Sequence, residues 1–321
     1  MTRWLLVGVG DIATKRVIPA LQQEPRSEIA AVVSRTPAKG RAYAPEVFPD
    51  LDSALASAAF DAVYLATPVS LHAPQTIAAL RAGKHVLCEK PTALDYAEAL
   101  TMVDAARETG KLLGVSYYRR LYPKVLRARQ LVAEGAIGRP VLAELENHSW
   151  FQAEDGKRAW LLDPVMSGGG PLYDIASHRI DLLNFFFGEP ARACGQRSRV
   201  VHQSRVEDSA TALVEYGNGV RGIVDVRWHS RVERDRFRIV GTEGEIDLSP
   251  LNGPDLVYPG GEESIPAPRN LHYPLIRNFV DAIEGKAALA SPVRDAVRTD
   301  WVTAQVLAAS PEPSPSYSLR T

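Results

Sequence analysis

Short apolar runs alternate with longer mixed segments through the first third of the chain. The runs, each ending in turn residues, lie at 4–9, 29–33, 62–66, 85–88 and 112–115. The segments between them are compatible with helices, most clearly 74–81 and 96–108. Short strands that are apolar on both faces and separated by helices indicate a parallel sheet covered on both sides. This part of the chain therefore predicts a doubly wound α/β fold, which binds ligands at the carboxyl ends of its strands.

The pattern changes after Tyr118. A helix is expected at 124–134, and two others at 171–187 and 274–284. The remaining segments are longer, more polar and alternating, as strands with one solvated face are. These expected strands lie at 141–150, 192–201, 209–216, 220–228 and 237–240. Gly217-Asn218-Gly219 joins two of them as a tight hairpin. We expect a second, α+β domain with a large, mostly antiparallel open sheet.

The chain thus divides into a first domain over 1–119, a second domain over 120–309 and a tail over 310–321. The tail is rich in proline and serine and predicts a flexible or partner-dependent segment. A chain of 321 residues with 45% hydrophobic content can bury two cores.

Charge and cysteine content exclude several classes of protein. Lys and Arg number 37 against 38 Asp and Glu, a net charge of -1 that gives no support for nucleic-acid binding. No apolar run approaches the ~20 residues that span a bilayer, and the opening strand leaves no room for a signal peptide. Cys88 and Cys194 form no metal-ligand spacing. We expect a soluble, reduced, cytoplasmic protein that binds neither metal nor membrane.

A glycine-rich turn, Gly8-Val9-Gly10-Asp11-Ile12-Ala13, directly follows the first apolar run. In a strand–turn–helix unit, the first glycine permits the turn and the second lets the backbone approach a pyrophosphate. The third small residue, here Ala13, lets helix and strand pack closely. The helix N-terminus then offers its N–H groups to the phosphates. The turn predicts a dinucleotide site.

The second strand ends in Ser34-Arg35-Thr36, without the carboxylate that reads the ribose in an NAD-preferring site. Arg35 can pair with a 2′-phosphate, with Ser34 and Thr36 donating from their hydroxyls. The alternative is a solvated loop arginine. We expect NADP as the preferred cofactor, with NAD possible.

Two further strand ends carry polar groups. Glu89-Lys90-Pro91 follows the apolar run 85–88, and a lysine there can hydrogen-bond a substrate oxygen. Pro91 permits a cis Lys90–Pro91 bond. A surface charge is the alternative reading of Lys90. Thr67 and Pro68 follow another run, and His72 beyond them is either near the nicotinamide or structural.

The third group of residues lies on a helix that follows Gly168-Gly169-Gly170-Pro171. Asp174 and His178 are four residues apart and share a face, which Asp181 continues. A carboxylate beside an imidazole fixes its tautomer, as a general base for an alcohol proton requires. The alternative is an exposed pair of little energetic weight.

With these residues the chain resembles the glucose–fructose oxidoreductase/inositol dehydrogenase/MocA family (Gfo/Idh/MocA). The motifs are the glycine turn, Glu89-Lys90-Pro91 and Asp174-Ile175-Ala176-Ser177-His178, the last preceded by Asp163-Pro164 and three glycines. The resemblance implies a Rossmann domain followed by a substrate-binding and oligomerisation domain, whose open sheet forms a homodimer or homotetramer interface. It implies reversible oxidation of a secondary hydroxyl on a sugar, cyclitol or related diol.

The resemblance also implies roles for individual residues. His178 is expected to accept the proton, Asp174 to orient it and the substrate, and Lys90 to tune the site. Expected substrate contacts are Lys90, Tyr118, Arg119, Trp160, Asp174 and His178; for the aromatic and arginine side chains, core or interface packing is the alternative. Expected cofactor contacts are Gly8, Gly10, Asp11, Ile12, Ala13, Ser34, Arg35, Thr36, Thr67, Pro68, His72, Glu89 and Lys90.

Two other functions stay open at this point. One is redox-neutral glycoside cleavage with a tightly held NAD. The other is a non-catalytic regulator that binds a dinucleotide, against which the retained Lys90, Asp174 and His178 argue.

Overall fold

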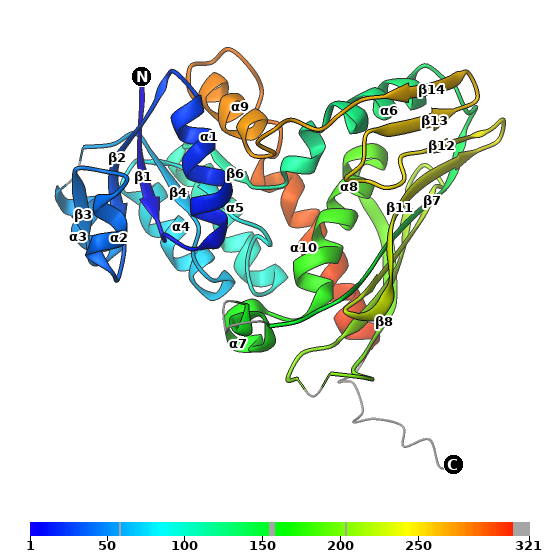
Figure 1. Ribbon diagram of the computed structural model, residues 1–321, viewed down its shortest axis with the longest axis horizontal. Coiled ribbons are helices and arrows are strands. Elements are labelled where there is room, and N and C mark those ends of the chain that lie inside the picture. The colour runs from blue at the N-terminus through cyan, green and yellow to red at the C-terminus, as the bar shows by residue number, and fades with distance from the viewer. Residues whose placement is uncertain (58, 154–157, 203, 311–321) are drawn as a thin grey trace. The chain divides into compact units, whose positions relative to one another are not determined.

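The chain forms two compact units (Figure 1). The computed structural model describes residues 1–57, 59–153, 158–202 and 204–310. One unit contains Met1–Leu121 and Pro268–Val297, and the other contains Tyr122–Ala267 and the chain from Arg298 on. The tail expected at 310–321 lies, beyond Ser310, outside the described residues.

The first unit is built on a six-stranded parallel sheet with the order β3-β2-β1-β4-β5-β6. Its strands are β1 Thr2–Val7, β2 Ser27–Val33, β3 Glu46–Phe48, β4 Ala62–Leu65, β5 His85–Cys88 and β6 Leu113–Val115. Its helices are η1 Ala13–Val17, α1 Ile18–Gln23, α2 Pro37–Arg41, α3 Leu51–Ser57, η2 Val69–Leu71, α4 His72–Arg81, α5 Tyr96–Thr109, η3 Tyr118–Leu121 and α9 Tyr273–Ile283. The strand order reverses between β1 and β4, as in a doubly wound fold. The predicted parallel sheet is confirmed.

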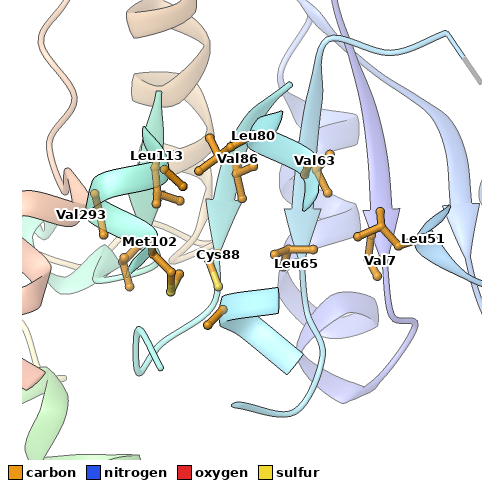
Figure 2. Packing of buried hydrophobic residues seen from close by; sticks show 14 of the residues in the cluster. Val7, Leu51, Val63, Leu65, Leu80, Val86, Cys88, Met102, Leu113 and Val293 are labelled. Carbon is orange, nitrogen blue, oxygen red and sulfur yellow. The ribbon is translucent and has the colours of Figure 1, made fainter. Parts of the chain in front are cut away.

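Alternate residues of each strand enter two separate cores, one on each face of the sheet. In β1, Leu5 and Val7 belong to one buried cluster, while Trp4 and Leu6 belong to the other. Figure 2 shows the first cluster, where side chains of β1, β4, β5 and β6 meet those of α3, α4 and α5. Burial on both faces explains why these strands read as continuous apolar runs.

The segment 268–297 lies in the first unit, although we expected 120–309 to form a single domain. The reason is the apolar face of α9. Ile276 and Phe279 on that face are fully buried in the same cluster as Trp4, and the rings of Phe279 and Trp4 lie 5.5 Å apart. The periodicity of α9 predicts a helix, but it does not say which sheet the helix covers.

The second unit contains an eight-stranded sheet with the order β14-β13-β12-β11-β7-β10-β9-β8. Neighbouring strands are antiparallel except β7 and β10, which are parallel. The strands are β7 Pro140–Trp150, β8 Pro190–Ser198, β9 Ser209–Tyr216, β10 Arg221–Arg227, β11 His229–Gly241, β12 Glu245–Asp247, β13 Asp255–Tyr258 and β14 Gly261–Ser264. The helices are α6 Pro123–Ala133, η5 Ala159–Leu162, α7 Pro164–Ser167, η6 Leu172–Ala176, α8 Ser177–Phe187 and α10 Val293–Ala309, which starts in the first unit. The mostly antiparallel sheet and the hairpin at 217–219 are confirmed.

One face of this second sheet is buried and the other is polar. In β10, Gly222, Val224 and Val226 are buried. A Cβ at Gly222 would lie 2.5 Å from Leu183 of α8, so the helix packs directly on the strand. The alternate residues of β10 are exposed or half-buried and include Asp225. The alternation seen in the sequence follows from this one-sided burial.

Candidate functional site

The glycine turn connects β1 to the helix η1. Gly8 has a φ of 94°, and a Cβ there would lie 2.7 Å from the backbone oxygen of Ala66. A Cβ at Gly10 would meet no atom within 4 Å, so the space beside Gly10 is open. Ala13, the first residue of η1, is fully buried. The turn therefore combines a tight backbone, close helix packing and free space at a helix N-terminus, as a pyrophosphate site requires.

Asp11 and Ile12 lie at the surface of this turn. The Lys15 ammonium donates to Asp11 Oδ2 over 2.9 Å, one helical turn apart. Ile12 is 38% exposed. Both residues are accessible beside Gly10, where the sequence predicts cofactor contacts.

The end of β2 holds the residues predicted to read the ribose. Ser34 is buried, and its hydroxyl donates to the Thr36 carbonyl over 3.0 Å and accepts from the Thr36 N–H over 3.2 Å. Arg35 between them is exposed. The Ser34 hydroxyl thus shapes the turn, and Arg35 is the accessible cation of the three residues.

His72 connects two strand ends of the first sheet. Its ring is 1% exposed. Nδ1 lies 2.8 Å from the Pro91 carbonyl, and Nε2 lies 3.0 Å from the Thr67 carbonyl. Burial lowers the pKa of His72 below its usual value, against the raising effect of these carbonyls. Both ring nitrogens face the backbone, which favours the structural role over a direct nicotinamide contact. Pro68 follows Thr67, whose hydroxyl donates to Gln75 over 2.8 Å.

Lys90 follows β5 directly and is half-buried, with a cis bond to Pro91. Its neighbour Glu89 is 6% exposed. Glu89 Oε1 accepts from the Tyr64 hydroxyl over 2.6 Å and lies 3.3 Å from Nε2 of His272. Glu89 Oε2 accepts from the backbone N–H of Lys90 over 3.2 Å. A buried carboxylate with three such neighbours thus lies directly beside Lys90.

The neighbours of Glu89 together change the pKa of its carboxyl more than burial does. Burial alone raises the pKa of the Glu89 carboxyl, but His272, Tyr64 and Lys90 together lower it below the usual value. Burial, followed by the Glu89 charge, raises the pKa of Tyr64 well above its usual value. Glu89 is therefore ionised at neutral pH, and Tyr64 remains a hydrogen-bond donor.

His272 and Tyr118 bring a second predicted residue into this network. Their rings are 4.4 Å apart and inclined by 32°. Arg119 donates to the Tyr118 hydroxyl over 2.8 Å and lies over the Tyr118 ring. Sequence reasoning missed His272, because its segment precedes α9 and no local pattern links that segment to Glu89.

The three glycines of the second unit enclose an aromatic ring and approach a backbone. A Cβ at Gly168 or Gly169 would lie 2.5 Å from the ring of Tyr173. A Cβ at Gly170 would lie 2.0 Å from the backbone oxygen of Glu207. The triplet therefore allows the start of the following helix to lie against Glu207 and Tyr173.

The Glu207 side chain holds this helix start. It is 2% exposed, and its Oε1 accepts from the N–H groups of Gly170 over 2.9 Å and Leu172 over 3.1 Å. Burial raises the pKa of Glu207, although these backbone donors oppose it. A carboxylate at a helix start satisfies N–H groups that have no partner within the helix. Sequence reasoning missed Glu207 as well, because Glu207 follows β8 in the chain and is therefore distant in sequence from the glycines that it contacts.

Asp174 and His178 lie on the helix that starts there. Asp174 is in the π-helical turn η6, and His178 is in α8 with 5% exposure. Arg158 donates to Asp174 Oδ2 over 3.1 Å. Asp181 further along α8 is also buried. Because His178 is buried and the Asp174 side chain is only 18% exposed, the alternative of an exposed Asp174/His178 pair does not describe this helix.

Trp160 packs within the second unit. It is half-buried against the cluster formed by Phe151, Leu161, Val206 and Trp228. The Arg158 guanidinium lies over the Phe151 ring, 4.7 Å from its centroid. Packing therefore buries part of the Trp160 side chain, as the alternative of a core role predicts.

The predicted catalytic residues are divided between the two units. Lys90 belongs to the first unit, with Glu89, Tyr118 and Arg119. Asp174 and His178 belong to the second, with Trp160.

The described part of the second unit also contains a cavity of about 330 Å³, lined by residues that include Arg197, Arg227, Ser209 and Ser310. None of the predicted site residues lines it. Two of the lining side chains have partners within the protein: Arg227 donates to Asp225, and Arg197 donates to the Ser310 carbonyl. Across the described ranges, no group of His, Cys, Asp and Glu could hold a metal. No helix within those ranges is long and apolar enough to cross a membrane.

The sheet order and the glycine turn define a Rossmann domain of the kind that binds a dinucleotide. Residues 2–117 match the family model described as "Oxidoreductase family, NAD-binding Rossmann fold", and residues 125–247 match the Gfo/Idh/MocA C-terminal domain. The chain belongs to the Gfo/Idh/MocA family of oxidoreductases.

Relatives match almost the whole chain. A 1,5-anhydro-D-fructose reductase from Ensifer adhaerens is 33% identical over 96% of this chain and 95% of its own. A D-xylose 1-dehydrogenase (NADP(+)) from Haloferax volcanii is 30% identical over 76% of this chain and 75% of its own. The crystal structure of aldose-aldose oxidoreductase from Caulobacter crescentus, complexed with glycerol, superposes with a TM-score of 0.85 at 25% identity, over 96% of this chain and 97% of that one.

Proposed function

We propose that the protein catalyses reversible hydride transfer between a nicotinamide cofactor, preferably NADP, and a secondary hydroxyl or keto group of a sugar, cyclitol or related diol. The observation that carries the proposal is the Asp174/His178 helix. A buried imidazole on the same helix as a carboxylate supplies a proton acceptor, which a protein that only binds a dinucleotide does not need. Relatives that are named as sugar reductases and dehydrogenases support the substrate class.

The first unit fits the cofactor by its own geometry. Open space beside Gly10, at the N-terminus of η1, suits a pyrophosphate. Asp11, Ile12 and Ala13 continue this turn, while Thr67 and Pro68 follow the neighbouring strand. When bound there, the nicotinamide supplies or takes up the hydride.

Arg35 carries the cofactor preference. Its exposed guanidinium at the end of β2 can bind a 2′-phosphate through paired hydrogen bonds, with the Thr36 hydroxyl beside it. β2 ends without the carboxylate that accepts from a ribose 2′-hydroxyl. NADP is accordingly the preferred form.

Three side chains of this chain handle the substrate proton. His178 takes the proton from the substrate hydroxyl as its carbon is oxidised, and returns it in the reverse direction. Asp174 orients the substrate and His178. The Lys90 ammonium donates to the substrate oxygen and favours its deprotonation. Tyr118, Arg119 and Trp160 present rings and a cation to the sugar, whose C–H faces pack on aromatic rings.

The open face of the eight-stranded sheet is the proposed interface of a homodimer or homotetramer. Leu213 and Val257 expose 48% and 46% of their surface on this sheet, and ion pairs such as Arg238 with Glu144 cross it between strands. We also infer a cytoplasmic location, where Cys88 and Cys194 remain thiols.

The test is a panel of sugars and sugar ketones, assayed with NADP(H) and NAD(H) by absorbance at the nicotinamide band. We expect turnover with at least one of them, and loss of that turnover in Lys90→Ala and His178→Ala with cofactor binding retained. Hydrolysis of a glycoside without net NADPH change would support the glycosidase reading instead. Cofactor binding with no turnover on any substrate would support the regulator.

A further inference from the structure

The cavity in the second unit, about 330 Å³ in volume, is lined by residues of β8, β9 and β10 and by the end of α10. The strand register places Ser198, Ser209 and Arg227 in one row across the three strands. Gln196 and Thr211 form the next row on the same face, because residues two apart in a strand point to the same side of a sheet. Two neighbouring rows of polar residues therefore meet at this cavity.

Arg197 lines the same cavity from β8. Its backbone N–H donates to Ser310 Oγ over 3.0 Å and its Nε donates to the Ser310 carbonyl over 3.3 Å, so the end of α10 lies against β8 (Figure 1). A guanidinium can donate from each of its nitrogens, whereas the described hydrogen bonds of Arg197 engage only its Nε. Both Nη groups of this half-buried side chain remain as donors for a ligand.

Arg227 is held in place by Asp225. Its Nε donates to Asp225 Oδ2 over 2.8 Å and its Nη2 donates to Oδ1 over 3.2 Å, while 40% of the Arg227 side chain stays exposed. The Thr211 hydroxyl donates to Asp225 Oδ1 over 2.6 Å, which fixes the carboxylate in turn. The guanidinium is therefore positioned by the sheet, and the described hydrogen bonds leave its Nη1 as a donor.

The residues around the cavity offer more hydrogen-bond donors than acceptors. The hydroxyls of Ser198 and Ser209 are 2.6 Å apart, so one donates to the other and the second keeps its own proton for a ligand. The exposed Gln196 adds an amide. Among the described residues that line the cavity, two are arginines and none is Asp or Glu. Such a cavity favours an anion with several acceptor oxygens, and phosphate matches the paired N–H groups of a guanidinium.

We propose that this cavity binds a small phosphate-bearing molecule through Arg197 and Arg227, with Ser198, Ser209 and Gln196 beside them. The volume lies at the lower end of the range for small-molecule sites, about 300–1,000 Å³. Free phosphate and a phosphate ester share the chemistry that the two arginines recognise. None of the residues proposed for the cofactor or the sugar lines the cavity, so this site is independent of the proposed activity.

Isothermal titration calorimetry of the full-length protein, in the oligomeric state in which it is purified, measures the binding of two probes. The probes are glucose 6-phosphate and inorganic phosphate, each at physiological ionic strength. We expect a Kd below ~1 mM for at least one of them. Tighter binding of glucose 6-phosphate would identify a phosphate ester as the ligand, and equal binding would identify the phosphate group alone. Binding of neither probe would overturn the proposal.

Substitutions locate the bound phosphate. Arg197→Gln and Arg227→Gln should each raise the Kd by about tenfold or more, as loss of a charge-assisted hydrogen bond does. Arg221→Gln is the matched control, because Arg221 is exposed at the other end of β10 and does not line the cavity. It should leave the Kd unchanged. Because Arg227→Gln leaves Asp225 without a partner that it has in the wild type, Arg197→Gln alone decides if circular dichroism shows that Arg227→Gln does not fold.

Arg35→Ala separates this cavity from the proposed cofactor site. The variant should bind the probe as the wild type does. Loss of binding in Arg35→Ala, with none in Arg197→Gln, would place the phosphate at the cofactor site and reject the cavity. A protein that reduces a sugar but binds neither probe would keep the proposed function and reject this site. Probe binding that depends on Arg197, in a protein that turns over no sugar, would do the reverse.

Discussion

Gly170→Ala is expected to disrupt the start of the Asp174/His178 helix. A methyl group there would lie 2.0 Å from the Glu207 carbonyl oxygen, far inside contact distance, and that oxygen is backbone and cannot rotate away. Relieving such a clash costs ~1–3 kcal/mol. The same shift weakens two hydrogen bonds from Gly170 and Leu172 to the Glu207 carboxylate, each worth about 1.5–3 kcal/mol. The free energy of unfolding should therefore fall by about 3 kcal/mol or more.

Urea unfolding followed by circular dichroism measures this change. Gly217→Ala is the control, because its new methyl group would meet nothing within 4 Å in the same unit, and it should change the free energy of unfolding by less than ~0.5 kcal/mol. Glu207→Ala removes both hydrogen bonds together with the buried side chain, and it should lower the free energy of unfolding by about 3–6 kcal/mol. A displaced helix should also lower kcat by ~100-fold. If Gly170→Ala is as stable and as active as Gly217→Ala, the assigned role of the triplet is wrong.

Three further predictions concern other parts of the chain. Burial lowers the pKa of Lys124 to about 8 from 10.5, so the unfolded chain binds more protons than the folded chain between these pH values. The free energy of unfolding of the wild type, relative to that of Lys124→Met, should therefore rise by about 3 kcal/mol between pH 8 and 10.5. Urea titrations that give the same difference between the two proteins at both pH values would refute this. Arg35→Ala should weaken NADPH binding by at least tenfold and leave NADH binding unchanged, by fluorescence titration; a parallel loss for both cofactors would argue against a 2′-phosphate contact. Gly8→Ala should abolish binding of both cofactors, because Gly8 has a φ of 94° and the new methyl group would lie 2.7 Å from the Ala66 backbone oxygen. Retained cofactor binding would contradict the assignment of a tight turn at Gly8.

The sequence predicts those strands of both sheets that bury one or both of their faces. β1, β2, β4 and β5 read as apolar runs because both their faces are covered, and β9 and β10 alternate because one face is. The short strands β3 and β12 to β14, which lie at or near a sheet edge, could not be predicted in this way. Three or four residues with partial burial give too short a pattern to separate a strand from a loop.

The site residues that the sequence predicts are those whose motif lies within a few neighbouring positions of the chain. The glycine turn, the lysine after β5 and the Asp174/His178 spacing each lie within a few residues. His272 and Glu207 could not be found in this way, since each acts on a segment that is distant in sequence. The contact of His272 with Glu89 spans 183 residues, and only the packing of α9 on the first sheet brings it about. The positions of such supporting groups depend on tertiary structure, whereas the residues that they support form recognisable motifs in the sequence.

The most direct test of the central claim is single-turnover oxidation of NADPH by a sugar ketone that the panel identifies as a substrate, in the wild type and in Lys90→Ala and His178→Ala. The claim predicts that the wild type oxidises NADPH. Both variants should bind NADPH within about threefold of the wild type yet react ~100-fold or more slowly, as loss of an acid–base group does. Wild-type rates in both variants would contradict the assignment of Lys90 and His178 to the chemistry.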